Sequence, residues 1–230
     1  MCMIRLCVFD MDGLLLDSER NLYIRIGMEV SEELGKPLSH EFLCSLMGGS
    51  WALYPGKVTA YYDGDFPIDE YMRRYWEKVD KIVYHEAIPK RPGVIEILDF
   101  CKENNIPMAV ATTTHEDKAI ACLKNAGLDS YFDYVITGDK VEHGKPDPEN
   151  YLKAVGHIGV TLEEALVFED GHNGAQAAIK GGIPLIIVQD LAKLSEEDVD
   201  KAVMVIDDIR KAIPYLKEEN ERTAGIQAQA

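Results

Sequence analysis

Short apolar runs alternate along this chain with longer segments whose apolar residues recur at helical spacing. The apolar runs predict strands at residues 4–9, 107–111, 134–136, 165–168, 184–188 and 202–206. The helical pattern is seen, for example, in Val94, Ile97, Leu98 and Cys101. Strands that alternate with helices are joined by right-handed crossovers into a mostly parallel sheet with helices on both faces. The pattern therefore predicts an α/β fold.

One stretch breaks this alternation, because residues 15–87 contain no segment with a strand pattern. They contain helical patterns at residues 21–34, 40–47, 51–62 and 68–84. Four helices placed directly after the first strand predict a separate helical domain at residues 15–87. The α/β domain then comprises residues 1–14 and 88–230, and the expected hinges are residues 14–17 and 85–91.

Composition restricts the partners of the protein. The 230 residues include 40 acidic and 24 basic side chains, which gives a formal net charge of −16. A field of this sign repels nucleic acids and anionic membranes, and it also disfavours a small phosphorylated ligand. The five cysteines show no metal-ligand spacing, and no apolar run reaches the roughly 18 residues of a membrane span. We expect a soluble cytoplasmic protein with free thiols, as a monomer or weak dimer.

The first candidate for chemistry is Asp10-Met11-Asp12-Gly13, which ends the first predicted strand. Side chains two residues apart on a strand point to the same side, so the two carboxylates converge. The carboxyl edge of a parallel sheet is where such folds bind ligands, and hard oxygen ligands there suit Mg²⁺. Alternatively, the segment is a solvated turn. A calcium loop is disfavoured because the further acidic ligands of that motif are missing.

A second candidate is the run Thr112-Thr113-Thr114, which follows another apolar strand and precedes a predicted helix at residues 116–126. Hydroxyl groups and free N–H groups at the start of a helix can bind phosphate. The simpler alternative is that Thr114 alone caps the helix.

Two further segments carry charged residues at loop positions. Lys145 lies between Gly144 and Pro146, in a loop that the prolines stiffen, although a lone lysine in a loop is usually solvated. Glu169 and Asp170 end a further apolar strand. They could complete a divalent-metal site with the first carboxylates or form an ordinary helix cap.

Taken together, in this order and each at a strand end, these segments resemble the four motifs of the haloacid dehalogenase-like superfamily. The helical stretch after the first strand is similar to the cap of the subgroup that contains phosphatases and beta-phosphoglucomutase. The motifs extend from Asp10 to Asp170, so the resemblance covers nearly the whole chain. It implies a Rossmann-like core with an inserted four-helix cap.

The resemblance implies a role for each matching residue. Asp10 would be the nucleophile, and Asp12 would protonate the leaving alcohol and then activate water. Thr112 and Thr113 would bind the phosphoryl oxygens. Lys145 would bridge Asp10 and the phosphoryl group and offset the charge that develops during transfer.

The resemblance also implies one cofactor, Mg²⁺. Its ligands would be Asp10, Asp170, the main-chain carbonyl of Asp12, and Glu169 either directly or through water. The cation would reduce the repulsion between a carboxylate nucleophile and a phosphate dianion. With Lys145, it would make the site locally attractive to a small phosphorylated metabolite despite the negative net charge.

Departures from the family pattern favour a phosphatase. Dehalogenases of the superfamily lack the second aspartate, which is present here as Asp12. Mutases of the beta-phosphoglucomutase type carry a His where this chain has Leu22, and Lys and Arg where it has Met47 and Trp51. A mutase must hold a second phosphate, so losing both cations counts against that alternative. A non-catalytic metal- and phosphate-binding module is the second alternative.

The cap loop suggests what the substrate carries besides phosphate. Met47, Gly48 and Trp51 make this loop apolar and aromatic, which suits a base, an aglycone or a short carbon skeleton. Packing in the cap is an equally good explanation for Trp51. We expect Arg20 and Arg25 to pair with acids on the cap surface.

Simple structural roles are expected for the remaining polar and aromatic features. We expect His172 to lie in a loop beside the metal site and residues 195–200 to form a solvated, capped helix. The aromatic side chains Tyr71, Tyr75 and Trp76 recur at helical spacing, so we expect them to pack inside the cap.

Overall fold

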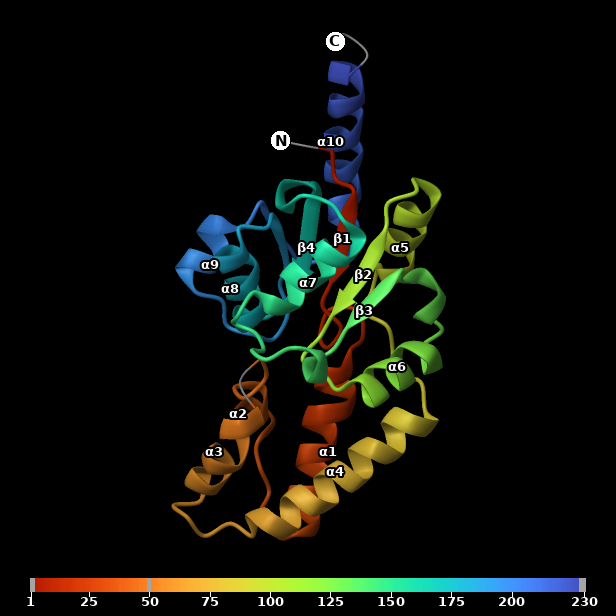
Figure 1. The fold of residues 1–230 in the computed structure, drawn as a ribbon. Helices are drawn as coiled ribbons and strands as arrows, with labels where there is room; N and C mark the ends of the chain where they lie inside the picture. Colours follow the sequence, from red (N-terminus) through yellow and green to blue (C-terminus); the bar gives the residue numbers. More distant parts are fainter. Residues whose placement is uncertain (1–2, 49–50, 228–230) are drawn as a thin grey trace.

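Six parallel strands form one sheet, in the order β3-β2-β1-β4-β5-β6. The structure is a computed structural model that describes residues 3–48 and 51–227. The strands are β1 (Leu6–Phe9), β2 (Met108–Ala111), β3 (Tyr134–Ile136), β4 (Ala165–Glu169), β5 (Leu185–Val188) and β6 (Met204–Ile206). The predicted α/β fold with a parallel sheet is confirmed (Figure 1).

Both faces of the sheet are covered by helices, and the alternation of side chains along each strand explains why. In β1, Leu6 and Val8 pack with one buried cluster, whereas Cys7 and Phe9 pack with the other. The first cluster includes residues of α7 (Glu149–Ile158) and α8 (His172–Gly181). The second includes residues of α5 (Val94–Glu103), α6 (Glu116–Asn125) and α10 (Ala212–Gln227).

Four of the six strands, β1, β2, β5 and β6, begin one or two residues later than the sequence pattern predicts. Pro107 and Pro184 precede β2 and β5 and cannot donate a backbone hydrogen bond to a neighbouring strand. Before β1, the backbone N–H of Ile4 donates to Asn220 of α10 at 3.0 Å. β4 ends one residue later than predicted, at Glu169, and the other five strands end where the pattern places them.

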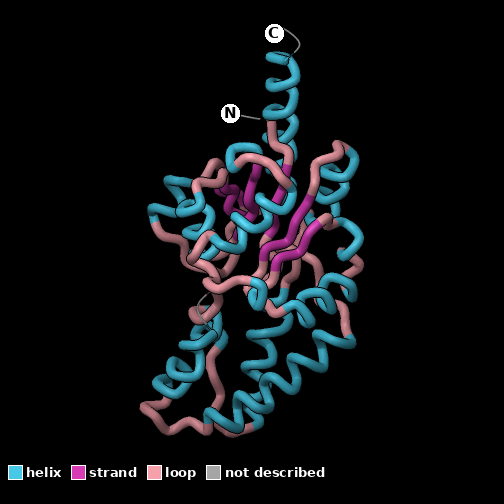
Figure 2. Tube along the Cα trace, in the orientation of Figure 1, coloured by secondary structure: helices cyan, strands magenta, loops and turns pink. Residues whose placement is uncertain are grey.

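The segment between β1 and α5 is helical, and Figure 2 shows the strands confined to the other part of the molecule. A π-helical turn (Glu19–Ile24) leads into α1 (Arg25–Glu33), and these are followed by α2 (His40–Cys44), a 3₁₀ turn (Trp51–Leu53), α3 (Tyr54–Tyr61) and α4 (Ile68–His85). Helices thus occupy each of the four segments expected to be helical, although α2 ends three residues early. We call residues 19–85 the cap.

The two chain segments that connect the cap to the sheet run side by side. The backbone N–H of Asp17 donates to the carbonyl of Pro89 at 2.8 Å, and that of Arg91 donates to the carbonyl of Leu15 at 3.0 Å. The bonded residues lie within segments 14–17 and 85–91, whose role as hinges stays a prediction. The cap side chains continue the cluster that includes Phe9, so cap and sheet share apolar packing.

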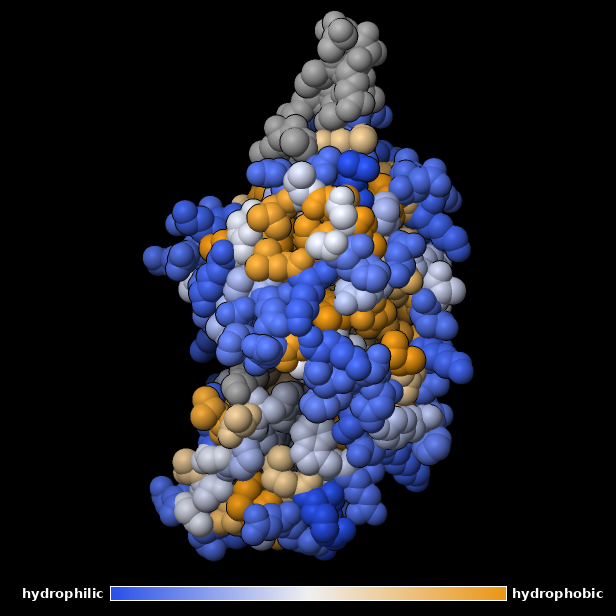
Figure 3. Space-filling view, viewed as in Figure 1, coloured by the Kyte–Doolittle hydropathy of each residue, from blue (hydrophilic) through white to orange (hydrophobic). Residues whose placement is uncertain are grey.

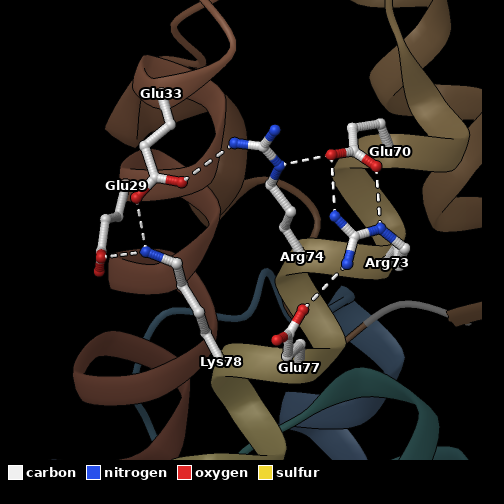
Figure 4. A network of polar contacts seen from close by, with 7 residues as sticks. All are labelled: Glu29, Glu33, Glu70, Arg73, Arg74, Glu77 and Lys78. Carbon is white, nitrogen blue, oxygen red and sulfur yellow. Dashed lines mark hydrogen bonds and ion pairs between the residues drawn. The ribbon is translucent and has the colours of Figure 1, made fainter.

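Within the cap, apolar packing and charge pairs join α1 to α4. Tyr71, Tyr75, Val79 and Val83 recur every four residues along α4 and are buried. The expected packing role of Tyr71 and Tyr75 is therefore confirmed. On the outer side, Lys78 and Arg74 of α4 pair with Glu33 of α1, at 2.6 and 3.7 Å (Figure 4).

One expectation about the region after β4 is wrong, and a second, the solvated and capped helix at residues 195–200, holds except at Asp198. His172 does not lie in a loop but begins α8, and its Nδ1 lies 2.6 Å from Oδ2 of Asp198. Asp198 belongs to α9 (Glu196–Lys201), the helix expected to be solvated. Ser195 does cap this helix, but the Asp198 side chain is buried because it packs towards α8, where it also accepts from Gln176 at 2.7 Å.

Hydrophilic residues make up most of the visible surface of both parts, with smaller hydrophobic patches between them (Figure 3). Within residues 3–48 and 51–227, each helix is too short or too polar to cross a lipid bilayer.

Candidate active site

A cavity of about 430 Å³ lies where the carboxyl ends of β1, β2 and β4 meet the cap. The strand register explains the meeting point, because Phe9 is paired with Val110 on one side and Phe168 on the other. The chain therefore leaves all three strands at one edge of the sheet. Every residue predicted for the site lines this cavity: Asp10, Asp12, Met47, Gly48, Trp51, Thr112, Thr113, Lys145, Glu169 and Asp170.

Lys145 is buried between two carboxylates, so it is not a solvated loop lysine. Its Nζ lies 2.5 Å from Oδ1 of Asp10 and 2.6 Å from Oε1 of Glu169, and its side chain is 4% exposed. Burial by itself would lower the pKa of Lys145, but the charges of Asp10 and Glu169 hold that pKa well above its ordinary value. The ammonium therefore stays charged beside the carboxylate predicted to be the nucleophile.

Glu169 is the centre of a hydrogen-bond network that the sequence did not predict. Its Oε1 accepts from Lys145 and from the Tyr151 hydroxyl at 2.8 Å. Its Oε2 accepts from the backbone N–H groups of Asp170 and Gly171, both at 3.0 Å. Both oxygens of the carboxylate are thus occupied by protein donors.

Asp170 joins Asp10 and Glu169 in a group of acids suited to a hard cation. Oxygen atoms of Asp10, Glu169 and Asp170 all lie within 4.8 Å of one another. Burial, followed by the charges of Glu169 and Asp10, raises the pKa of Asp170 well above its ordinary value. A bound cation would offset the unfavourable free energy of placing several buried carboxylates close together. Carboxylate oxygens are the ligands that Mg²⁺ prefers, so the residues present fit that ion.

Gly13 allows the backbone after Asp12 to pack directly against this group. Its φ angle is +90°, and a Cβ atom at this position would lie 2.2 Å from Oδ2 of Asp170. A larger residue would therefore displace the Asp170 carboxylate.

Three hydroxyl groups hold the carboxylate of Asp12. Ser18 and Tyr23 donate to its Oδ1 at 2.7 and 3.3 Å, and Thr114 donates to its Oδ2 at 2.7 Å. The alternative that Thr114 caps the next helix is wrong, since His115 occupies the N-cap position. Asp12 and Thr114 are 102 residues apart in the chain, so the sequence pattern did not predict their contact.

Thr112 and Thr113 follow β2 and line the cavity together with Asp10. The backbone N–H of Thr112 donates to the carbonyl of Ile136, and the N–H of Thr114 donates to the Thr112 hydroxyl oxygen, both at 3.0 Å. Among the described residues, nothing accepts from the N–H of Thr113. The threonine hydroxyls and this N–H are therefore the groups available to a phosphoryl oxygen.

The cap contributes an apolar and aromatic wall to the cavity. The Trp51 ring lies 5.2 Å from the ring of Tyr23 and 5.0 Å from that of Tyr54, measured between centroids. The Asn173 side chain at the start of α8 donates to the carbonyl of Gly48 at 2.9 Å, which ties the cap loop to the sheet domain. Gly49 and Ser50 lie outside the described residues.

Positive charge is scarce in this cavity. Within the described part of the chain, Lys145 is the single Lys, Arg or His among its lining residues. The expectation that Arg20 pairs with acids on the cap surface is wrong in part. It does pair with Asp17 at 3.3 Å, but it also pairs with Asp190, a buried acid of the sheet domain that Arg91 contacts at 2.9 Å.

Glu19 is a lining residue that sequence reasoning missed. It is 6% exposed, and within the described residues its Oε2 has no hydrogen-bond partner. Burial, with the charges of Asp190 and Asp12, raises the pKa of Glu19 to about 7. No local spacing distinguishes this glutamate from a solvated one at the start of a helix.

Comparison with known proteins places this site in a family. Residues 7–188 match the family described as haloacid dehalogenase-like hydrolase. The chain belongs to the haloacid dehalogenase-like hydrolase family. The resemblance drawn from the four motifs is thereby confirmed.

Individual relatives of this hydrolase are named as phosphatases. It is 37% identical over 180 residues to a phosphorylated carbohydrates phosphatase of Thermotoga maritima, covering 78% of this chain and 82% of that protein. It is 31% identical over 206 residues to a Drosophila melanogaster protein provisionally named a pseudouridine-5'-phosphatase, covering 87% of each. These matches confirm the prediction of an enzyme that hydrolyses phosphoric monoesters.

The fold has close structural counterparts as well. A crystal structure from Thermotoga maritima, provisionally named a beta-phosphoglucomutase, superimposes with a TM-score of 0.77 at 30% identity. The match covers 93% of this chain and 99% of that one.

Proposed function

We propose that this hydrolase is a Mg²⁺-dependent phosphatase that cleaves a small phosphomonoester through an aspartyl-phosphate on Asp10. The observation that carries the proposal is the buried contact of 2.5 Å between Lys145 and Asp10. A carboxylate held by an ammonium at the carboxyl edge of the sheet can approach a phosphate dianion with less repulsion. We also propose that residues 15–87 form the cap domain and that residues 1–14 and 88–230 form the catalytic domain.

The reaction has two steps. In the first, a carboxylate oxygen of Asp10 bonds to phosphorus, the ester P–O bond breaks, and the carboxyl proton of Asp12 passes to the leaving oxygen. In the second, water attacks phosphorus, Asp12 takes a proton from that water, and the bond between phosphorus and Asp10 breaks. The products are the alcohol and inorganic phosphate, and Asp10 is regenerated.

The other lining residues support both steps. The hydroxyls of Thr112 and Thr113 would donate to the phosphoryl oxygens, and Lys145 would neutralise charge on them. Asp10, Asp170 and the carbonyl of Asp12 would hold Mg²⁺, which supplies charge neutralisation for the phosphoryl group. Glu169 would contact the ion through water, because protein donors already occupy both of its oxygens.

The cavity favours an uncharged leaving group. Its wall of Tyr23, Trp51 and Tyr54 suits a sugar or base face, and its described lining residues include no second cation for another anionic group. Carbohydrate and pseudouridine, which appear in the names of two relatives, are both uncharged. We therefore propose a phosphorylated sugar or nucleoside as the substrate class, with Met47, Gly48 and Trp51 contributing to its selection.

A mutase is the second candidate, because a structural relative carries that provisional name. It would interconvert sugar phosphates and would be stimulated by a sugar bisphosphate. The absence of a second cation among the described lining residues argues against it.

The test is turnover of a panel of phosphomonoesters with Mg²⁺ and with excess chelator. We expect Mg²⁺-dependent phosphate release, a phosphorylated peptide containing Asp10 after acid quench, and loss of both in Asp10→Asn. Asp200→Asn, on the exposed side of α9, is the matched control. Near-normal activity of Asp10→Asn would refute the mechanism. Stimulation of sugar-phosphate interconversion by a bisphosphate would establish the mutase, and no turnover across the panel would favour a binding module.

A further inference from the structure

Three hydroxyl groups from different segments of the chain donate to the carboxylate of Asp12. Thr114 comes from the loop after β2, whereas Tyr23 comes from the first turn of the cap, and they bind opposite oxygens of the carboxylate. Ser18, which is fully buried, shares Oδ1 with Tyr23. The carboxylate is therefore fixed from the sheet domain on one side and from the cap on the other.

The Tyr23 hydroxyl reaches Asp12 from the cap side of the cavity. Its side chain is 9% exposed and lies against the Trp51 ring, so most of it is shielded from water. Burial, with the negative charge of Asp12, raises the pKa of Tyr23 well above its ordinary value. Tyr23 consequently remains a neutral donor.

We propose that Thr114 and Tyr23 are positioning residues that orient the carboxyl group of Asp12 for proton transfer to the leaving oxygen. This inference rests on the proposed function, in which Asp12 donates a proton while the ester P–O bond breaks. Without these two contacts, Ser18 holds Asp12 at one oxygen only, and the carboxyl group can rotate about its terminal torsion, which is a soft one. Rotation moves the proton away from the line of transfer and slows the step that requires it.

The consequence depends on the leaving group. An alkoxide is a poor leaving group and needs its proton during bond cleavage, whereas a nitrophenolate leaves without much help. The ratio kcat/KM reports only steps up to the first irreversible one, so it isolates transfer to Asp10 from the later attack of water. Weakened orientation of Asp12 must therefore lower kcat/KM for alkyl phosphates far more than for p-nitrophenyl phosphate.

The experiment compares Thr114→Val and Tyr23→Phe with the wild-type protein on one alkyl phosphate and on p-nitrophenyl phosphate, both with Mg²⁺. We expect kcat/KM for the alkyl phosphate to fall about 10- to 100-fold, and that for p-nitrophenyl phosphate to change less than about threefold. Thr114→Ser keeps the hydroxyl and should restore the alkyl activity.

Matched controls lie elsewhere in the cap. Tyr62→Phe removes a hydroxyl that donates to the carbonyl of Pro37, and Thr59→Val removes one that donates to the carbonyl of Pro55. Both should leave the ratio between the two substrates unchanged. Circular dichroism and thermal unfolding of each variant show whether it folds as the wild type does.

Equal losses on both substrates, or no loss on either, would overturn the positioning role. Failure of Thr114→Ser to restore alkyl activity would do so as well. Failure of the proposed function looks different, because Asp10→Asn would then keep its activity on both substrates in the same assay.

Discussion

The Tyr151 hydroxyl lies 2.8 Å from Oε1 of Glu169, the oxygen that also accepts a hydrogen bond from Lys145. Tyr151 is fully buried on α7, and its ring lies 4.8 Å from the Lys145 ammonium. A residue of a covering helix thus supports the charged pair at the sheet edge. Its contribution to activity would be indirect, through Glu169 and Lys145.

Replacing Tyr151 by Phe should therefore reduce activity without preventing folding. We expect kcat to fall about tenfold at nearly constant KM, because the hydrogen bond orients a charged group. The free energy of unfolding should fall by about 1–3 kcal/mol for the same reason. Steady-state kinetics and urea unfolding measure the two effects.

Tyr131→Phe is the control for this variant. Its hydroxyl also binds a carboxylate, that of Asp99 at 2.7 Å, but it does not line the cavity. A fall in kcat of similar size in Tyr131→Phe would mean that Tyr151 acts on general stability only.

Lys145 has a direct role in the proposed reaction, so its removal should be more severe. In Lys145→Met we expect kcat to fall about 10³-fold, the scale found when one stabilising donor is removed from an active site. Without a metal ion, the variant also leaves the buried carboxylates of Asp10 and Glu169 unpaired. Its unfolding free energy in excess chelator should therefore be about 3–5 kcal/mol lower than that of the wild type. Activity within tenfold of the wild type would contradict the proposed role.

Gly174 provides a test of how closely α8 must approach Glu169. A Cβ atom at position 174 would lie 1.6 Å from Oε1 of Glu169, so Gly174→Ala must displace a buried carboxylate. We expect lower stability and at least a tenfold loss of kcat, since Glu169 holds Lys145. Gly156→Ala is the control, because a Cβ there meets no atom within 4 Å and alanine favours a helix by about 1 kcal/mol. Normal activity of Gly174→Ala would show that the Glu169 contact is dispensable.

Much of the fold follows from local pattern. In β1, Cys7 and Phe9 face one buried cluster while Leu6 and Val8 face the other, and both faces are covered as expected for a parallel sheet. The rule that ligands bind at the carboxyl ends of such strands was enough to group Asp10 with Asp170. Most residues of the candidate site could therefore be predicted from their positions at the ends of strands.

The supporting residues were not predictable in this way. Tyr151 has the spacing of an ordinary core residue on α7, and nothing near it in the sequence indicates Glu169. Tyr23 in the cap and Thr114 after β2 both bind Asp12, and no local sequence motif indicates either contact. Asp198 illustrates the same limit, because its helix is capped as expected while its carboxylate is buried against His172. Contacts between distant segments require the packed structure.

The last prediction concerns the charge network on the outer side of the cap (Figure 4). Glu70, in the first turn of α4, accepts hydrogen bonds from Arg73 at 2.9 Å and from Arg74 at 2.6 Å. These contacts lower the pKa of Glu70 from its ordinary value of 4.5 to about 2. A glutamate with a lowered pKa in the folded state stabilises the fold above pH 4.5, and this stabilisation is lost as the pH falls from 4.5 towards 2.

Glu70→Gln should therefore lower the Tm by a small amount at pH 7, and the difference from the wild type should shrink steadily below pH 4.5. Added salt should also reduce the difference at pH 7, because the network is exposed and salt screens it. Thermal unfolding between pH 3 and 8 measures both effects, with Glu218→Gln on α10 as the control for losing one exposed helical carboxylate. A Tm difference that does not change with pH would show that the Glu70 side chain contributes by packing and not by charge.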